Sequence, residues 1–435
     1  MPSTAVLRRR ILARQARVVV VGQGYVGLSM ACAIAEAGFE VVGIDVDADR
    51  VGALAAGNLV VAGVDEATFR SGMATARLRF SCEREALTSG EVICICVPTP
   101  VRDHTPDLSF VEQACRDVAK GLTTNTLVIL ESTTYPGTTT ELVGPLLEIS
   151  GLRVGRDFLL AYSPERIDPG NSEYHLANTP KVVGGTSAEA TAVAALFYEQ
   201  MIEKVVTVSS ARAAELTKLL ENTFRHVNIA LVNEMATVCH ELGIDVWEVI
   251  EAAATKPFGF MAFTPGPGVG GHCIPLDPTY LAWQVRRDVG HQFRILEQAQ
   301  DVNAQMPGWV GRRIGEALNE HAKPLKGARV LVLGVTYKPD VGDVRESPSL
   351  RVMATLARRG ARLAFHDPFV AEVTVDGRRL ARTELTAKAV ARADLVALLT
   401  PHSAYDLEWL AGTAPLVFDA HNAFGPSGQP NVVLL

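Results

Sequence analysis

The part of the sequence best suited to covalent chemistry is residues 265–281, PGPGVGGHCIPLDPTYL. Its four prolines and four glycines disfavour a helix or a central strand, so we expect a shaped loop. Cys273 stands near the middle of this loop, and Asp277 follows four residues later. A thiolate in that setting could act as a nucleophile. A linker turn around a buried cysteine is an equally good interpretation of this segment taken alone.

A second pair of residues suited to catalysis is Lys218 and Asn222, four positions apart in a stretch with helical periodicity. Residues at that spacing share one face of a helix. An ammonium and an amide on one face could together stabilise a developing alkoxide. A solvated pair on a helix surface is the alternative.

A glycine pattern near the N-terminus indicates a dinucleotide site. The apolar run 18–21 leads into GQGYVG, residues 22–27, and the next apolar run ends at Asp45. In such a turn the first glycine permits the tight bend, the second lets the backbone approach a pyrophosphate, and the third lets helix and strand pack closely. Asp45 would accept from the ribose hydroxyls and repel a 2′-phosphate, which favours NAD over NADP. The predicted cofactor contacts here are Gly22, Gly24, Tyr25, Val26, Gly27 and Asp45.

Three further loops follow apolar runs and carry polar side chains. They are CVPTP (96–100), ESTTYPG (131–137) and YSPER (162–166). Ligands of open α/β sheets bind outside the carboxyl ends of the strands. The hydroxyls of Thr99 and Thr133 could therefore contact a cofactor or a water, and Glu165 could act as a general base. Ordinary turns and a solvated carboxylate are the alternatives.

A cationic loop, YKPDVGDVRESP (337–348), follows an apolar run in the last third of the chain. Lys338 and Arg345 suit contacts with phosphate or sugar groups. A surface loop held by salt bridges is the alternative.

The elements that would position these residues alternate in type along the chain. Short apolar runs predict strands over 18–21, 39–44, 92–97, 126–130 and 158–162, and again over 330–335, 363–365, 394–399 and 416–418. With helical patterns between several of them, they predict an α/β fold class with two Rossmann-like, doubly wound domains.

One long helix should join these two domains. Residues 211–242 contain neither proline nor glycine and predict a helix of about 30 residues, in which Leu219 and Leu220 should pack inward. A second helix is expected over 246–254. The predicted domains are an N-terminal arm (1–17), a Rossmann domain (18–210), a central helical domain with the cysteine loop (211–305) and a second Rossmann-like domain (306–435).

Composition limits the possible partners. The 435 residues are 48% hydrophobic and 20% charged, which is typical of a globular chain. The net charge of −7 argues against a nucleic-acid partner. No apolar stretch reaches 18 residues, so no membrane span is expected. The arginine-rich first 17 residues lack the apolar core of a secretory signal, and we expect a mobile or helical extension there.

The seven cysteines are an odd number without CxxC spacing, which is typical of reduced thiols in a cytoplasmic protein. His272 adjoins Cys273, but no second Cys/His pair at ligand spacing accompanies it, so no metal is expected.

In their order, these motifs resemble those of the nucleotide-sugar 6-dehydrogenase family, the UDP-glucose/GDP-mannose dehydrogenases. GYVG, CVPTP, STTYPGT, SPER, KLLEN, GGHCIPLDP and YKPDVGDVRESP follow the family's order from Val18 to about Asn422. The wording of LESTTYPGTT, YSPERIDPGN and AATKPFGF is most similar to the bacterial UDP-N-acetyl-D-glucosamine 6-dehydrogenases of surface-polysaccharide synthesis. The branches acting on UDP-N-acetylmannosamine and on UDP-glucose are the next in similarity.

The resemblance implies an NAD-binding domain, a central helix that also builds a homodimer or a higher homo-oligomer, and a C-terminal domain that binds a UDP-sugar. It implies two successive hydride transfers from C6, which convert the alcohol to a carboxylate and consume two NAD. The departures are NLVVAGVDEA (58–67), less polar than expected, and Ile167, where the most similar branch commonly has an acidic residue. They bear on the sugar accepted.

By the same resemblance, Cys273 forms a thiohemiacetal and then a thioester. Lys218 and Asn222 would hold the oxyanion, Asp277 and Thr133 would orient the hydrolytic water, and Glu165 would serve in acid/base or hydrolysis work. The other implied cofactor contacts are Pro98, Thr99, Thr133 and Arg345. The implied substrate contacts are Glu165, Lys218, Asn222 and Lys338, with Gly268, Gly270 and Gly271 letting the loop wrap the sugar closely.

Two other functions stay open. A two-electron NAD dehydrogenase of the hydroxyacid type would use Lys218 and Asn222 but would not need Cys273. A catalytically silent protein could bind a nucleotide sugar as a regulator. The number of NADH formed per sugar, with and without Cys273, distinguishes all three.

Overall fold

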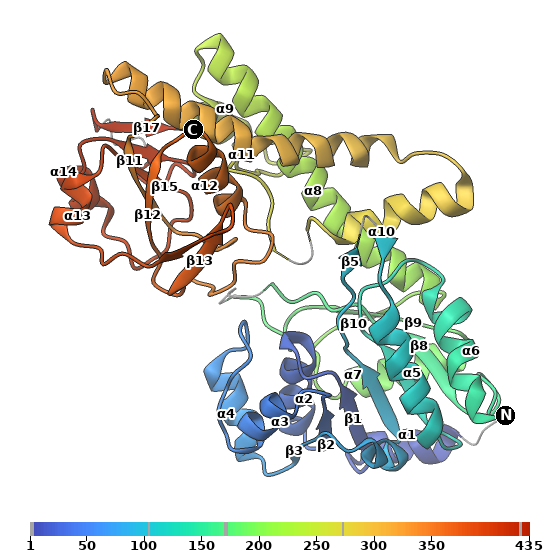
Figure 1. Cartoon of the computed structure of the whole chain (residues 1–435). Coiled ribbons are helices and arrows are strands. Elements are labelled where there is room, and N and C mark those ends of the chain that lie inside the picture. The colour runs from blue at the N-terminus through green and yellow to red at the C-terminus, as the bar shows by residue number, and fades with distance from the viewer. Residues whose placement is uncertain (1–3, 103–104, 169–172, 272–273, 426–428) are drawn as a thin grey trace. The chain divides into compact units, whose positions relative to one another are not determined.

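The computed structural model describes residues 4–102, 105–168, 173–271, 274–425 and 429–435. The chain forms two compact units (Figure 1). The first comprises residues 1–221 and 279–290, and the second comprises residues 222–278 and 291–435.

The first unit is built on an eight-stranded sheet in the order β10-β9-β8-β7-β4-β1-β2-β3. Its strands are β1 (Arg17–Val21), β2 (Glu40–Ile44), β3 (Leu78–Ser81), β4 (Val92–Ile95), β7 (Leu127–Leu130), β8 (Leu159–Tyr162), β9 (Lys181–Gly185) and β10 (Val205–Thr207). The pairs are parallel except for β8 and β9, which run antiparallel. Every residue of β4, β7 and β8 is buried, as their uniformly apolar sequences require.

The helices of this unit alternate with its strands along the chain. They are α1 (Thr4–Leu12), α2 (Tyr25–Glu36), α3 (Ala48–Ala55), α4 (Glu66–Ala74), α5 (Ser109–Gly121), α6 (Gly144–Leu147) and α7 (Ala188–Tyr198). The shorter elements are η1 (Arg84–Ser89), η2 (Thr139–Val143), η3 (Glu148–Ser150) and the hairpin β5 (Val101–Arg102) with β6 (Thr105–Pro106). The side chains of Asp47, Asp65 and Ser187 cap α3, α4 and α7, which fixes where these helices begin.

The N-terminal arm is the helix α1, which packs on α7. Leu7 and Ile11 are buried in the same apolar cluster as α2 and α7, and Arg8 pairs with Glu189 of α7. The arginines lie at other positions of the helix, so its apolar face, with Leu7 and Ile11, packs against the rest of the unit.

The central helix α8 spans Ala211–Leu242, as predicted. Leu219 is buried, but Leu220 is 63% exposed, so the expectation that both pack inward is wrong for Leu220. Consecutive residues point about 100° apart on a helix, and only one of the two can face the core. The helix α9 (Val246–Ala254) also matches its prediction.

The loop expected over 265–281 ends earlier than predicted. The helix α10 begins at Asp277 and runs to Gln284, followed by the π-helical turn η4 (Val285–Val289). Pro278 does not prevent this, because a proline in the first helical turn interrupts no intrahelical hydrogen bond.

The second unit repeats the α/β pattern around a five-stranded parallel sheet in the order β12-β11-β15-β16-β17 (Figure 1). Its elements are α11 (Arg294–Glu320), β11 (Arg329–Leu333), α12 (Pro348–Arg358), β12 (Arg362–His366), α13 (Ala387–Arg392), β15 (Leu395–Leu398), α14 (Leu407–Thr413), β16 (Val417–Asp419) and β17 (Val432–Leu434), with the hairpin β13 (Glu372–Val375) and β14 (Arg378–Ala381). Alternate strand residues pack against α11 and α12 on one face and against α13 and α14 on the other. Among the described residues, no helix is both long and apolar enough to cross a membrane.

Candidate active site

The glycine turn that follows β1 has the geometry of a dinucleotide site. Gly22 has a φ of +92°, and a Cβ on Gly27 would lie 1.8 Å from the carbonyl oxygen of Gly22. Only glycine fits at these two positions, because one needs a left-handed backbone and the other a close contact between helix and strand. At Gly24, by contrast, a Cβ would meet nothing within 4 Å. The turn is therefore open at Gly24, where Tyr25 and Val26 begin α2, and it can admit a pyrophosphate beside the N–H groups of that helix.

Asp45 stands beyond the end of β2, where the predicted ribose contact should be. Its Oδ2 accepts from the backbone N–H of Gln23 at 2.7 Å and from Arg50 Nη1 at 3.0 Å. Arg50, on α3, was not among the sequence-predicted residues, although its position five residues after the acid was a usable signal. The pair sets one carboxylate and one guanidinium where the sequence predicts the ribose contact.

The loops after β4 and β7 are joined by hydrogen bonds. Ser132 Oγ donates to the carbonyl of Val97 at 2.8 Å, and the hydroxyl of Tyr280 donates to the carbonyl of Thr99 at 2.9 Å. Pro98 is exposed, Thr99 is buried and Thr133 is half-buried. The structure thus places Pro98, Thr99 and Thr133 at the carboxyl end of the sheet, on the edge that carries Gly22 and Asp45.

Glu215, in the second turn of α8, anchors the turn that follows Thr133. Its buried carboxylate accepts from the backbone N–H groups of Gly137 at 2.5 Å and Thr139 at 2.8 Å. This contact was not foreseen from the sequence.

Glu165 lies in a buried ionic network. Its Oε1 accepts from the N–H groups of Arg166 at 2.6 Å and Ile167 at 2.7 Å, and its Oε2 pairs with Lys181 Nζ at 3.1 Å. Burial would raise the pKa of this carboxyl, but the Lys181 ammonium and the two N–H groups outweigh burial and hold the pKa below its usual range. Glu165 is therefore an anion at neutral pH, which suits a base or an electrostatic role and not a proton donor.

Lys218 approaches Glu165 from α8. Its Nζ donates to the backbone carbonyl of Glu165 at 2.6 Å, and the residue is 8% exposed. The alternative of a solvated surface lysine is thereby excluded. An ammonium fixed by one acceptor still has two N–H bonds for a ligand oxygen.

Asn222, one turn further along α8, donates a hydrogen bond from Nδ2 to Asp277 Oδ2 at the start of α10. Asp277 is 4% exposed. The structure thus brings two of the predicted residues into direct contact. Cys273, with His272, lies outside the described residues.

Two buried cysteines near the carboxyl ends of the strands, Cys94 and Cys96, are poorly suited to act as nucleophiles. Burial and the charge of Glu131 raise the pKa of Cys94 and Cys96 well above the ordinary value of a thiol. Both therefore stay protonated, and a protonated thiol is a weak nucleophile.

The glycines of the cysteine loop pack against the cationic loop of the second unit. The N–H of Gly271 donates to the carbonyl of Arg345 at 3.1 Å, and a Cβ on Gly270 would lie 2.7 Å from Cβ of Tyr337. Gly268, with a φ of +129°, lies against Asn303 and Pro348 in the same way. These glycines therefore pack closely against protein atoms, and their contact with a sugar stays a prediction.

The cationic loop itself is held by ion pairs and by a buried histidine. Arg345 pairs with Asp343, with 2.6 Å between Nη2 and Oδ2, and the hydroxyl of Thr336 donates to the carbonyl of Lys338 at 2.9 Å. His402 Nε2 lies 3.0 Å from Asp367 Oδ2, and its Nδ1 accepts from the N–H of Asp340. Lys338 and Arg345 therefore sit on a loop fixed at the carboxyl end of β11.

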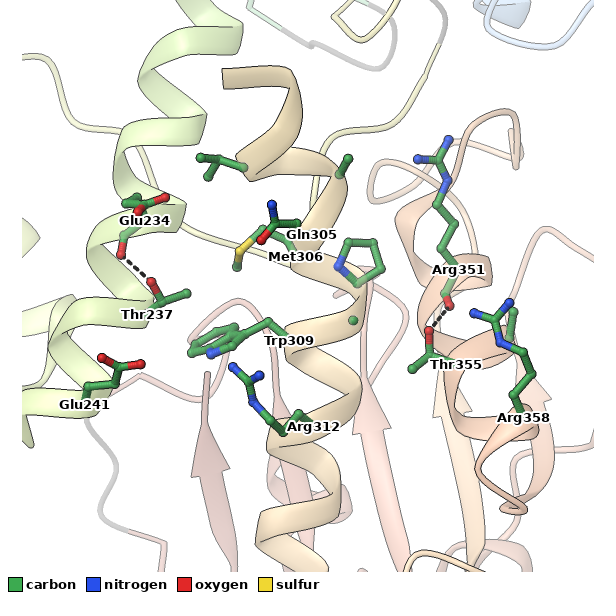
Figure 2. Close-up of a pocket in the computed structure, with 15 residues that line it drawn as sticks. Glu234, Thr237, Glu241, Gln305, Met306, Trp309, Arg312, Arg351, Thr355 and Arg358 are labelled. Atoms are coloured by element: carbon green, nitrogen blue, oxygen red, sulfur yellow. Dashed lines mark hydrogen bonds between the residues drawn. The ribbon is translucent and has the colours of Figure 1, made fainter. Parts of the chain in front are cut away.

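A groove of about 760 Å³ lies elsewhere in this unit, between α8, α11 and α12 (Figure 2). Glu234, Thr237 and Glu241 lie along α8, while Arg351, Thr355 and Arg358 lie along α12, with Trp309 and Arg312 of α11 between them. None of the described residues predicted for catalysis lines this groove.

Comparison with known proteins agrees with this organisation. Family models of the UDP-glucose/GDP-mannose dehydrogenases match the NAD binding domain over residues 16–202, the central domain over 212–305 and the UDP binding domain over 331–426. NAD is therefore the cofactor, and the glycine turn at residues 22–27 lies within the matched NAD binding domain.

Individual relatives cover most of the chain. The UDP-N-acetyl-D-glucosamine 6-dehydrogenase of Pseudomonas aeruginosa is 37% identical over 81% of this chain and 83% of its own. The UDP-N-acetyl-D-mannosamine dehydrogenase of Pyrococcus horikoshii is 36% identical over 81% and 84%. A solved structure of UDP-D-ManNAc dehydrogenase from P. horikoshii superimposes with a TM-score of 0.84 over 93% of this chain and 95% of that one, at 33% identity. The chain is thus an NAD-dependent oxidoreductase that belongs to the UDP-glucose/GDP-mannose dehydrogenase family.

Proposed function

We propose that this protein oxidises the C6 alcohol of a UDP-2-acetamido sugar to the uronic acid, with UDP-N-acetyl-D-glucosamine as the preferred substrate. The observation that carries the proposal is the hydrogen bond between Asn222 and Asp277, four residues beyond Cys273. This contact ties the helix of the predicted oxyanion donors to the end of the cysteine loop.

The proposed reaction has four steps. The first hydride leaves C6 and gives an aldehyde. The Cys273 thiolate then adds to the aldehyde carbon, and the alkoxide so formed is stabilised by Lys218 and Asn222. A second hydride leaves the thiohemiacetal to give a thioester, and water cleaves the C–S bond to give the carboxylate and the free thiol. NAD, when bound at the glycine turn, accepts each hydride.

Residues of the chain would guide the last step. Asp277 and Thr133 are proposed to orient the attacking water, and the Glu165 carboxylate to favour its deprotonation. The net reaction is one alcohol, two NAD⁺ and one water to one carboxylate, two NADH and three protons.

The choice of an acetamido sugar is supported by the relatives and by the motif wording. UDP-N-acetyl-D-mannosamine is the second candidate, because the relative named for it is 36% identical, against 37% for the relative named for the glucosamine sugar. UDP-glucose follows. Lys338 and Arg345, on the loop after β11, are proposed to contact the nucleotide sugar and the cofactor side, respectively.

A panel assay tests the substrate. NADH formation is followed with UDP-N-acetylglucosamine, UDP-N-acetylmannosamine, UDP-N-acetylgalactosamine and UDP-glucose under identical conditions. We expect the highest kcat/KM with the first. A higher value with the manno sugar would replace the substrate but keep the reaction, and no NADH with any of the four would refute the proposed function.

We further propose that α8 builds a homodimer. Seven exposed apolar residues repeat along one face of the helix: Leu216, Leu220, Phe224, Leu231, Met235, Val238 and Leu242. Their spacing of three, four or seven positions makes a continuous stripe, which monomeric proteins rarely leave in water.

A cytoplasmic location is also proposed, since the described cysteines are free thiols, which fits a reducing compartment.

A further inference from the structure

The position of the buried cation beside Glu165 follows from the one antiparallel pairing in the eight-stranded sheet. β9 pairs with β8 in the antiparallel sense, with Ala161 opposite Gly185 and Tyr162 opposite Gly184. Continued at this register, Glu165 falls opposite Lys181, the first residue of β9. If β9 ran parallel to β8, Lys181, its first residue, would lie at the amino end of β8. The carboxyl end of β8, where Glu165 lies, would then lack the cation.

Lys181 is enclosed by two carboxylates and an aromatic ring. Its Nζ lies 2.8 Å from Glu131 Oε2 and 3.1 Å from Glu165 Oε2, and 5.3 Å from the ring centroid of Tyr198. Tyr198 in turn donates its hydroxyl to Glu131 Oε1 at 2.5 Å. The side chains of Lys181, Glu131 and Glu165 are 3%, 0% and 9% exposed, so water can screen little of this interaction.

A charge buried this deeply needs a function or a structural reason to be kept, because apolar residues of similar volume often serve stability as well. The network connects to a residue proposed for catalysis: the carbonyl of Glu165 accepts from Lys218 Nζ. Arg166, the next residue, ties the same loop to α8 through Glu221 at 2.7 Å and to the start of β9 through the carbonyl of Pro180. The loop 163–167 is thus fixed from both β9 and α8.

We propose that Lys181 is a positioning residue that keeps Glu165 ionised and, through the backbone of Glu165, sets the position of Lys218. This inference deepens the proposed function and rests on it. Lys181 does not touch the reacting atoms. Its role is to keep a carboxylate anionic where burial would otherwise protonate it.

The test compares pH profiles of kcat/KM for UDP-N-acetylglucosamine oxidation. In Lys181→Met combined with Glu131→Gln, Glu165 loses its cation without leaving a second unpaired carboxylate. An opposite charge at this distance lowers a carboxyl pKa by about one to three units, so its removal should move the acid limb up by about that amount. We expect kcat/KM to fall by about tenfold for each pH unit below the shifted limb, and to recover to within about threefold of the wild type at pH 8.5. A uniform loss at every pH would indicate a merely structural role and would overturn the proposal.

Three further variants serve as controls. Tyr198→Phe removes only the hydrogen bond to Glu131 and should leave the acid limb in place. Lys181→Arg retains the charge and should keep the limb near that of the wild type. Glu131→Gln alone removes one of the two carboxylates that pair with Lys181, so that Glu165 keeps the cation. The pH of the acid limb should therefore stay in place or fall. If Glu131→Gln raises the limb, Lys181 is not the controlling group, and this variant decides the matter even if the lysine variants do not fold.

A second readout is independent of turnover. The carboxylate infrared band that disappears in Glu165→Gln is titrated in the wild type and in the double variant. Its midpoint should rise by about one to three pH units in the double variant. An unchanged midpoint would overturn the inference, whichever substrate the enzyme oxidises. A shifted midpoint in a protein that oxidises no UDP-sugar would support the role of Lys181 in keeping Glu165 ionised but would refute the proposed function.

Discussion

Lys218 and Asn222 are proposed to stabilise the oxyanion, and a hydrogen bond to the protein holds each of them in place. Lys218 donates to the Glu165 carbonyl and Asn222 to Asp277. Because an oxyanion donor acts in the transition state, Asn222→Ala should lower kcat by about 10²–10³-fold, equivalent to about 3–4 kcal/mol, with a smaller change in KM. Steady-state kinetics with the best UDP-sugar measure this. Asn319→Ala, at an exposed position of α11, is the control, and an unchanged kcat in Asn222→Ala would remove Asn222 from the site.

Gly24 and Gly27 form a matched pair in the cofactor turn. A methyl group at Gly24 meets no protein atom within 4 Å, whereas at Gly27 it lies 1.8 Å from a backbone oxygen. Gly24→Ala should therefore weaken NAD binding by an order of magnitude or more without changing the melting temperature. Gly27→Ala should lower stability by about 1–3 kcal/mol or more through overpacking. Calorimetric titration with NAD and thermal unfolding separate the two effects, and equal loss of stability in both variants would contradict the assignment.

Asp45 should set the choice between NAD and NADP. Its charge repels a 2′-phosphate, and two like charges about 4 Å apart repel by about 1–4 kcal/mol between bulk water and a protein surface. Asp45→Asn should thus raise the ratio of kcat/KM for NADP to that for NAD by roughly tenfold or more. Asp49→Asn, which removes the same charge at an exposed position of α3, should leave this ratio unchanged. An unaltered ratio in Asp45→Asn would show that Arg50 or the backbone sets the preference.

At the scale of elements, α8 and α11 pack around a buried polar group. His226 of α8 is 2% exposed and contacts Asn303 of α11, which also pairs with Asn233. Burial lowers the pKa of His226 from 6.5 to about 4. The folded state therefore binds its proton less readily than the unfolded state does, and stability from this group is present above pH 6.5 and is lost as pH falls from 6.5 towards 4.

That loss predicts a pH-dependent difference between variants. The two pKa values differ by about 2.5 units, or about 3 kcal/mol at 1.36 kcal/mol per unit. Denaturant unfolding of His226→Gln should lose correspondingly less stability between pH 7.5 and pH 4.5 than the wild type does. His291→Gln, at an exposed position, should lose as much as the wild type, and identical pH dependence in all three proteins would contradict the assignment.

The elements that the sequence predicted best are those whose pattern is long or uniformly apolar. The strands around Val18, Val92, Leu127 and Leu159 and the helices 211–242 and 246–254 are confirmed, because complete burial and regular periodicity leave a clear local signal. In the eight-stranded sheet the strands β3, β9 and β10 were missed. β9 is five residues long and ends in two glycines, so its sequence reads as a turn.

The candidate site motifs stand out in the sequence because their residue types are unusual locally, but the residues that contact them in the fold do not. Glu165 and Lys181 are 16 positions apart, and they meet only because β9 runs antiparallel to β8, which no local pattern reports. Glu131, Tyr198 and Glu215 likewise contribute through tertiary contacts. The sequence predicted that the glycines at 268, 270 and 271 let the loop wrap the sugar, but it did not show that protein atoms also pack closely against them.

At the scale of the whole molecule, the exposed stripe on α8 makes a prediction about assembly. Leu231 is 58% exposed near the middle of the stripe, and a charge there would oppose burial against a second copy. Leu231→Glu should shift the protein from dimer to monomer in light scattering after size-exclusion chromatography. Ile149→Glu, at a 68% exposed site outside α8, should not. A wild-type monomer at micromolar concentration would contradict the proposed dimer.

The central claim is a four-electron oxidation through a thioester on Cys273. The most direct test is the number of NADH formed per UDP-N-acetylglucosamine consumed, in the wild type and in Cys273→Ala. We expect two NADH and one uronic acid for each sugar consumed by the wild type. In Cys273→Ala we expect at most one NADH per sugar, with aldehyde as the product. Two NADH per sugar at an unchanged rate in Cys273→Ala would contradict the central claim.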